Sequence, residues 1–156
     1  MRISAFYLTL AAALGVPAWA AAQAITECEW IGTPANIVEP WDVNSRTFAN
    51  GNIRVAWLDT GGEPVCCSSH LLILSPSGNG QDEPIYRQCR VASAGPGQGF
   101  YSVDVPGINA RYDPSRGLTL SVPIGHWHPG MENGVGPIPD RMEIVINQAT
   151  GLVAFE

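Results

Sequence analysis

The sequence predicts an all-β fold, a single antiparallel β-sandwich of about eight short strands stapled by disulfides, with a distorted small β-barrel as the alternative. Seventeen glycines and thirteen prolines interrupt the chain too often for long helices. Between them, short segments alternate apolar and polar residues, which is the period of a half-buried strand. Four cysteines follow an N-terminal segment of the export-signal type, and an even number of cysteines in an exported chain predicts disulfides.

The N-terminal segment has the features of a signal peptide. Arg2 precedes an apolar run over 5–16, and the sequence Ala-Gln-Ala at 22–24 is a small-x-small site of the kind that signal peptidase cuts. The apolar run of about 12 residues is shorter than the roughly 20 that a membrane-spanning helix needs. We therefore interpret residues 1–24 as a signal peptide and expect a periplasmic or secreted protein.

Cleavage between Ala24 and Ile25 leaves residues 25–156 as a single β domain. This mature chain has no lysine, and its seven arginines stand against fourteen acidic residues, a net charge of −7. Binding to a nucleic-acid backbone or to anionic lipid requires clustered positive charge, which this domain lacks. The expected partner is an unidentified protein or small ligand, with no nucleic acid and no membrane span in the mature chain.

The first half of the mature chain contains three expected strand regions. A short strand is expected over 28–31, and 46–58 reads as a hairpin closed by a two-residue Asn-Gly turn at 50–51. The next strand, 65–74, is apolar on both faces over 71–74. Such a run belongs in the middle of a sheet or beneath a second layer.

The second half continues the alternating pattern. Further strands are expected over 85–91, 100–105 and 118–124, and in a final hairpin made of 142–146 and 152–155. Between them, 108–112 predicts a turn of helix, and 125–140 predicts a long loop rich in glycine and proline. Pro123 predicts that its strand lies at a sheet edge, because proline cannot donate a ladder hydrogen bond.

The two adjacent cysteines, Cys66 and Cys67, point to opposite faces if they lie on a strand. Together with Cys28 and Cys89 they allow three disulfide connectivities. Pairing Cys66 with Cys67 closes a small ring that disulfide geometry makes uncommon. In both remaining connectivities, disulfides join this strand to the N-terminal segment and to the following strand, so we expect one of them.

Those two connectivities place a demand on the chain between the strands. A symmetric hairpin centred on Gly80 would leave Cys89 about four positions, or roughly 13 Å, from the cysteine pair. That distance is too long for a disulfide. Either the loop closes asymmetrically or the two strands are not simple neighbours.

The clearest candidate for chemistry is the segment that begins at His126. On a strand, His126 and His128 point the same way, so both imidazoles can bind one metal ion, and Met131 or Glu132 is within loop reach. Copper or zinc is the expected guest, and Met131 favours copper. His70 is an alternative third ligand, although a hydrogen-bonded position in the sheet is the simpler interpretation.

The spacing His-x-His-x-x-x-Glu over 126–132 is similar to the core of the first metal motif of cupins, which are β-barrels. The resemblance covers seven residues and implies a metal site there. It departs from the family where Leu120 stands in place of the leading glycine of the motif. In addition, no histidine follows His128 to supply the ligand of the second motif.

The strand register tests this histidine pair. Continuing the alternation of 118–124 would turn His126 and His128 toward the core, whereas a bulge at Gly125 would expose both and bury Trp127. We expect the bulge, with surface histidines beside a packed tryptophan. Trp41 and Trp127 both adjoin proline-rich loops; packing in the core is the simpler interpretation, and a flat platform for a sugar or peptide is the alternative.

The predicted function is that of an exported small β domain, a non-catalytic binding or envelope-support protein without a cofactor. The first alternative is a copper- or zinc-binding periplasmic protein that uses His126 and His128. The second alternative, an exported hydrolase, rests on the compartment alone. No catalytic residue is assigned, because the serines and histidine over 68–70 are neighbours on a strand and face opposite sides.

Overall fold

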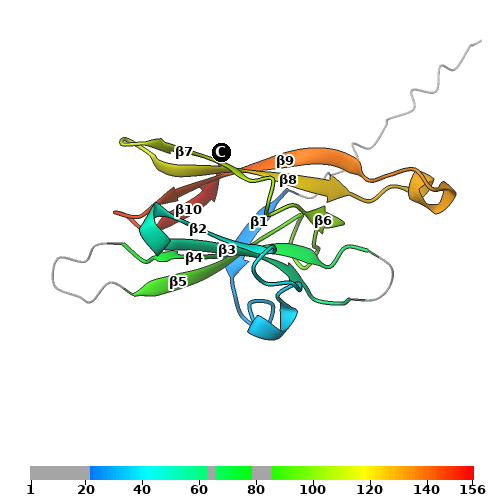
Figure 1. The fold of residues 1–156 in the computed structure, drawn as a ribbon, viewed down its shortest axis with the longest axis horizontal. Coiled ribbons are helices and arrows are strands. Elements are labelled where there is room, and N and C mark those ends of the chain that lie inside the picture. The colour runs from blue at the N-terminus through cyan, green and yellow to red at the C-terminus, as the bar shows by residue number, and fades with distance from the viewer. Residues whose placement is uncertain (1–21, 63–65, 79–85) are drawn as a thin grey trace, which may run out of the picture.

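The structure, a computed structural model, describes residues 22–62, 66–78 and 86–156. It confirms the all-β prediction: two antiparallel five-stranded sheets face one another as a sandwich (Figure 1). The first sheet has the order β1 (Ala24–Glu27), β5 (Arg87–Ser93), β4 (Ser69–Pro76), β3 (Ile53–Asp59), β2 (Ser45–Phe48). The second contains β10 (Leu152–Phe155), β9 (Ile138–Asn147) and β8 (Gly117–His126), with β6 (Ser102–Val103) and β7 (Asn109–Asp113) both paired to the remaining edge of β8.

The main core lies between the sheets and is built by the predicted alternation. Ile53 and Val55 of β3 point inward with Leu71 of β4, and each is at most 1% exposed. The second sheet contributes the inward residues of β8 and β9, namely Leu118, Leu120, Val122, Ile124, Met142, Ile144 and Ile146. Burial of each such side chain contributes about 1.5–3 kcal/mol, so this layer is the principal source of stability.

A second, smaller core explains why the centre of β4 is apolar on both faces. Leu72 packs with Leu58 and Val91 on the outer face of the first sheet. Ile31 and Ile37 cover this face from the segment that follows β1, which runs beneath the sheet in Figure 1. This run was predicted to lie in the middle of a sheet or beneath a second layer; β4 is the middle strand, and its outer face is also covered.

The predicted signal peptide falls largely outside the described residues, which begin at residue 22. Ala24, its predicted last residue, is the first residue of β1 and pairs with Ser93 of β5. Over 22–62, 66–78 and 86–156 the structure has no helix long and apolar enough to cross a bilayer.

Two local predictions for the first half of the chain are wrong. The first strand is 24–27 rather than 28–31, because the chain turns where the Gly32 N–H donates to the Cys28 carbonyl. The Asn-Gly hairpin forms, but Phe48 pairs with Ile53, so four residues including the 3-10 turn η2 (Ala49–Gly51) connect β2 and β3.

The predicted turn of helix over 108–112 is instead strand β7, whose residues are all exposed. Strand β7 has no buried face, so its residues do not show the alternation of apolar and polar side chains that marks a half-buried strand. With the two-residue β6 counted as well, the described part of the chain forms ten strands, against the expected eight or so.

Pro123 lies on an internal strand, contrary to the edge prediction, because β8 is paired on both sides. The Asp104 N–H donates to the Pro123 carbonyl at 3.0 Å, so the side of Pro123 without an N–H faces the gap between β6 and β7. In that gap the chain leaves the sheet, and no ladder hydrogen bond is lost.

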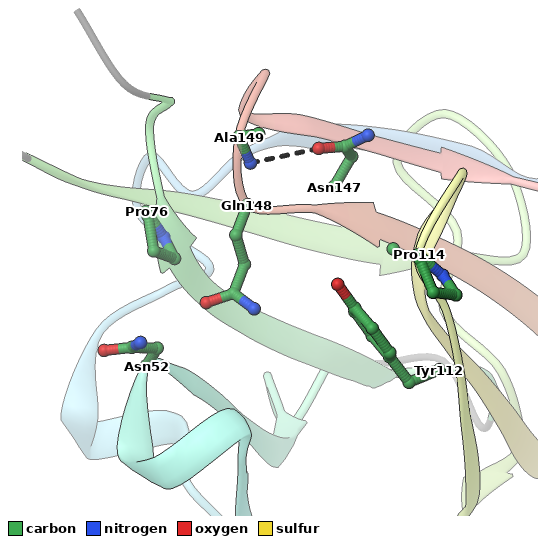
Figure 2. A pocket seen from close by; sticks show the side chains of 8 residues that line it. Asn52, Pro76, Tyr112, Pro114, Asn147, Gln148 and Ala149 are labelled. Atoms are coloured by element: carbon green, nitrogen blue, oxygen red, sulfur yellow. Dashed lines mark hydrogen bonds between the residues drawn. The ribbon is translucent and has the colours of Figure 1, made fainter.

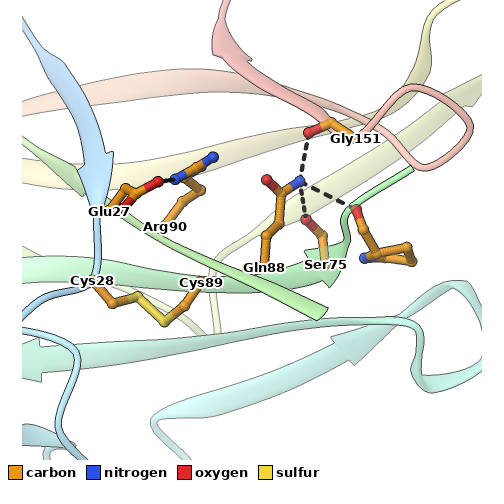
Figure 3. Close-up of polar contacts among 8 residues, drawn as sticks. Glu27, Cys28, Ser75, Gln88, Cys89, Arg90 and Gly151 are labelled. Carbon is orange, nitrogen blue, oxygen red and sulfur yellow. Dashed lines mark hydrogen bonds and ion pairs between the residues drawn. A yellow bond between two sulfur atoms is a disulfide. The ribbon is translucent and has the colours of Figure 1, made fainter. Parts of the chain in front are cut away.

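The disulfides are Cys28–Cys89 and Cys66–Cys67. The prediction that disulfides join the double-cysteine strand to the N-terminal segment and to the following strand is therefore wrong. Cys66 and Cys67 precede β4 rather than lying in it, and the argument from alternating faces needs a strand. Strands β4 and β5 are direct neighbours, with Leu74 opposite Cys89. Cys28, the residue after β1, is bonded to Cys89 of β5 (Figure 3), and their Cα atoms are 5.4 Å apart.

Candidate functional site

Two cavities lie at opposite ends of strands β4 and β8. The disulfide cavity, of about 300 Å³, lies where β4 begins and β8 ends, and its lining includes Cys66, Cys67, Tyr101, His126 and Trp127. The amide cavity, of about 400 Å³, lies where β4 ends and β8 begins, and its lining includes Asn52, Pro76, Tyr112, Pro114, Asn147 and Gln148. The first unites two stretches that the sequence singled out, and the second was not predicted.

His126 points toward the core end of the sandwich because β8 has no bulge. The register with β9 is unbroken through Gly125 to the pair His126–Ile138, so the predicted bulge is wrong. A Cβ atom at Gly125 would lie 2.5 Å from Ser102 Oγ, so glycine allows the close approach of β6. Trp127 is 38% exposed rather than packed, and the histidines are not fully exposed.

Asp140 is the neighbour of His126 that the sequence did not indicate. The two lie on adjacent strands, and His126 Nε2 is 3.1 Å from Asp140 Oδ2. The backbone N–H of Arg141, then the His126 side chain, lowers the pKa of Asp140 from its usual value. The Phe100 and His126 rings pack in a T-shaped arrangement with their centroids 6.0 Å apart, which holds the imidazole in the lining of the disulfide cavity.

His128 is a structural residue of the loop between β8 and β9. It is the N-cap of the 3-10 turn η3 (Pro129–Asn133): Nδ1 accepts from the Gly130 N–H at 3.2 Å. Nε2 lies 2.8 Å from the Gly136 carbonyl oxygen, so the neutral ring with its proton on Nε2 satisfies both partners. Both nitrogens that a metal would use are thus engaged within the loop.

Met131 and Glu132 lie within η3, in the same loop as His128. Among the residues that the structure describes, no three His, Cys, Asp or Glu side chains are grouped closely enough to hold a metal ion. The copper or zinc site at 126–132 stays a prediction. In the structure, the side chain that lies beside His126 is that of Asp140 and not that of His128.

Replacing His128 by alanine should lower the free energy of unfolding by about 1 kcal/mol, because it removes a cap and a second loop hydrogen bond. Asparagine keeps an acceptor for the Gly130 N–H but is too short to reach the Gly136 carbonyl, so His128→Asn should recover part of the loss. Urea unfolding of both variants measures this. Wild-type stability in His128→Ala would contradict the capping role.

His70 is a hydrogen-bonded residue of β4, as its simpler interpretation predicted. It is 3% exposed, and Nδ1 lies 2.8 Å from Ser93 Oγ on β5, a partner that the sequence did not indicate. Ser93 is itself only 4% exposed, so a substrate has no access to its oxygen and the pair does not form a hydrolase centre. Burial lowers the pKa of His70, partly opposed by the charge of Asp59.

This shift predicts a pH dependence of stability. The unfolded chain binds a proton near pH 6.5, whereas folded His70 resists protonation, so stability falls as pH drops from about 7 through 6.5 and levels off below the lowered pKa. His70→Asn keeps an acceptor near Ser93 but does not titrate, and its stability should change less over pH 7 to 5. Urea unfolding across this range tests it; parallel curves for the two proteins would contradict it.

The amide cavity is built by turns from both sheets. The η2 turn brings Asn52 from the first sheet, and the β7–β8 hairpin brings Tyr112 from the second. The turn between β9 and β10 brings Asn147 and Gln148. Figure 2 shows the Gln148 amide and the Tyr112 hydroxyl pointing into the same space, with Asn52 bordering it from the opposite sheet.

Hydrogen bonds fix the turns around this cavity. Asn147 Oδ1 accepts from the Ala149 N–H at 3.0 Å, which shapes the turn and sets where Gln148 begins (Figure 2). On the other side, Arg87 Nη1 donates to the Asn52 carbonyl at 2.9 Å. Hydrogen bonds of the backbone and of side chains therefore hold the walls of the cavity in place without a contribution from a ligand.

Gln88 ties the two sheets together beside this cavity. Its amide group donates to Ser75 Oγ at 3.2 Å, to the Pro76 carbonyl at 3.1 Å and to the Gly151 carbonyl in the β9–β10 turn (Figure 3). Gly151 has φ of +76°, and a Cβ there would strike the backbone of Ser77. This close contact holds the wall at Pro76 against the turn that carries Gln148.

The two tryptophans proposed as a platform lie on different parts of the molecule. Trp127 lines the disulfide cavity, whereas Trp41 is 53% exposed in the turn before β2 and lines neither the disulfide cavity nor the amide cavity. Comparison with protein families, with curated proteins and with solved structures finds no match to the chain.

Proposed function

We propose that the protein is a small exported, non-catalytic binding domain and that the amide cavity is its ligand site. The observation that carries the proposal is the lining itself. Tyr112, Gln148 and Asn52 present a hydroxyl and two amides to one space, and none of them hydrogen-bonds through its side chain to another described residue. Groups that can both donate and accept, without a nucleophile beside a base, support binding rather than catalysis.

The size and rigidity of the cavity support the same proposal. A volume of about 400 Å³ lies within the range of about 300–1,000 Å³ typical of small-molecule sites. Its walls are fixed by Gln88 and by the turn at Asn147, so little ordering is required when a ligand binds.

Export is supported by the cysteines. Both pairs are disulfides and no cysteine is free, which suits an oxidising compartment. We therefore keep the signal-peptide interpretation and propose a periplasmic or secreted location. Expression of the full chain in a bacterium should yield a protein outside the cytoplasm whose N-terminal residue is Ile25; a cytoplasmic, uncleaved chain would contradict export.

The binding role is tested by an NMR fragment screen on the purified, oxidised protein. Neutral fragments that carry hydroxyl or amide groups should shift the backbone signals of Asn52, Tyr112 and Gln148, and charged fragments of equal size should shift them less. Shifts confined to the disulfide cavity, or none at all, would overturn the amide cavity as the ligand site.

The copper or zinc alternative makes a separate prediction. Because the loop engages both His128 nitrogens, we expect no stoichiometric metal in the purified protein and no rise in melting temperature when copper or zinc is added. Elemental analysis and thermal unfolding measure this. A stabilisation that disappears in both His126→Ala and His128→Ala would instead establish the metal site.

A further inference from the structure

We infer that the ligand of the amide cavity is a neutral saccharide. This inference rests on the proposed function and adds the chemical class of the ligand. A sugar ring presents hydroxyl groups at its edge and apolar C–H groups on its faces, so its site needs hydrogen-bonding amides and an apolar or aromatic wall together. The amide cavity brings together both kinds of group.

The polar part matches the hydroxyl groups of a sugar. Each amide side chain offers an acceptor oxygen and two N–H donors, and the Tyr112 hydroxyl both donates and accepts. Adjacent hydroxyls on a sugar ring likewise donate and accept, so one amide can bind two of them at once. Figure 2 shows Gln148 entering the cavity from one side and Tyr112 from another, so a ligand between them is met by both.

The apolar part matches the faces of a sugar ring. Tyr112 is 67% exposed, so its ring has a free face outside the protein core. Pro76 at the end of β4 and Pro114 in the turn between β7 and β8 add rigid apolar walls, and rigid walls lose little conformational freedom on binding. An exposed aromatic ring with a polar hydroxyl is suited to a ligand that has both apolar faces and hydrated polar groups.

The charged side chains near the cavity already have hydrogen-bond partners within the protein, which favours a neutral ligand. Arg116 forms an ion pair with Glu156 at 2.6 Å, and Arg87 donates to the Asn52 carbonyl. Ser115 hydrogen-bonds the Asp113 carboxylate, which keeps the pKa of that group below its usual value. None of the described residues that line the cavity is charged.

A proline-rich peptide is the competing ligand, and the lining favours a sugar over it. Polyproline segments dock in grooves lined by several aromatic side chains. Here Tyr112 is the one aromatic residue among the described lining, and the amides of Asn52 and Gln148 border the same space. A proline offers these amides only its carbonyl acceptor, because it has no N–H to donate, whereas a sugar hydroxyl both donates and accepts.

The experiment is an NMR titration of the oxidised protein with four probes. They are N-acetylglucosamine, its β-1,4-linked tetrasaccharide, glucuronic acid as the charged counterpart, and a ten-residue polyproline peptide. We expect a neutral sugar to shift the signals of Asn52, Tyr112 and Gln148, with the tetrasaccharide binding more tightly than the single sugar.

Variants locate the site. Tyr112→Ala should raise the dissociation constant by about tenfold, and Gln148→Ala by about fivefold, the effect of losing one ring contact and about one hydrogen bond. Tyr112 is exposed and Gln148 is half-buried without a side-chain hydrogen bond to the described residues, so the variants are expected to fold. Trp41→Ala is the matched control, because it removes an exposed aromatic ring outside the cavity and should leave the dissociation constant unchanged.

Each other outcome overturns something specific. Binding of polyproline but of no sugar would overturn the saccharide and leave the binding function intact. Tighter binding of glucuronic acid than of the neutral sugars would overturn the neutral class. Loss of sugar binding in Trp41→Ala but not in Tyr112→Ala would move the site away from the cavity, and no shift with any probe would remove both the saccharide and the proposed binding site.

Discussion

Replacing Cys28 and Cys89 together by alanine is expected to lower the free energy of unfolding by about 4 kcal/mol, whereas replacing Cys66 and Cys67 together should lower it by about 1 kcal/mol. The first bridge closes a loop across a sequence separation of 61 residues, and the second joins adjacent residues. A longer closed loop removes more conformational entropy from the unfolded chain. Urea unfolding without reductant measures both losses, and equal losses would contradict the pairing.

The pairing itself can be read from a tryptic digest. The chain has no lysine, and cleavage at its arginines places Cys28, the adjacent cysteine pair and Cys89 on three different peptides. Without reductant, the Cys28 peptide should be linked to the tripeptide 88–90. The peptide 55–87 should run alone with no free thiol. Any peptide that links 55–87 to either of the others would overturn the connectivity.

The second large effect is expected at Gly99. Its N–H donates to the Cys67 carbonyl at 2.8 Å, and a Cβ atom built on it would lie 2.5 Å from that oxygen and 2.7 Å from the Ser69 carbonyl oxygen. Both atoms belong to the backbone, so no side-chain rotation relieves the contact. Relief would separate Phe100 from its paired hydrogen bonds with Ser69 and pull a fully buried ring from the core.

We therefore expect Gly99→Ala to lower the free energy of unfolding by about 3 kcal/mol, combining overpacking with lost hydrogen bonds. Gly136→Ala is the matched control, because a Cβ there meets nothing within 4 Å. It should change stability by less than about 0.5 kcal/mol. Urea unfolding compares the two, and equal stability would show that the chain around Cys67 adjusts freely.

The parts of the fold that could be predicted from the sequence are the strands in which apolar and polar residues alternate. Leu118, Leu120 and Val122 alternate because one face of β8 is buried, so both the strand and its inward face could be predicted. Strand β7 could not, since it is exposed on both faces and forms only by pairing with β8. The edge position predicted from Pro123 was wrong because the missing N–H of this proline faces a gap between two strands. That gap depends on the course of residues 104–109.

The candidate site was predictable only in part. His126, Trp127 and the cysteine pair were singled out, but nothing local indicates that they line one cavity, because β8 and the start of β4 are distant in the sequence. Asn52, Tyr112 and Gln148 read as ordinary turn residues, and they meet only because three hairpins end at one place. A pairing of β8 with β9, once assumed, does place Asp140 near His126 and could have suggested that contact.

The single long-range disulfide also decides how the protein would respond to mechanical force. A chain stretched from residues 22 and 156 transmits tension through Cys28 and Cys89 and bypasses everything between them. The bypassed 61-residue separation corresponds to a contour length of about 200 Å that cannot be extended until the bridge is reduced. Strands β2, β3 and β4 lie in that stretch, so under load most of the first sheet is shielded while the second sheet can be drawn out.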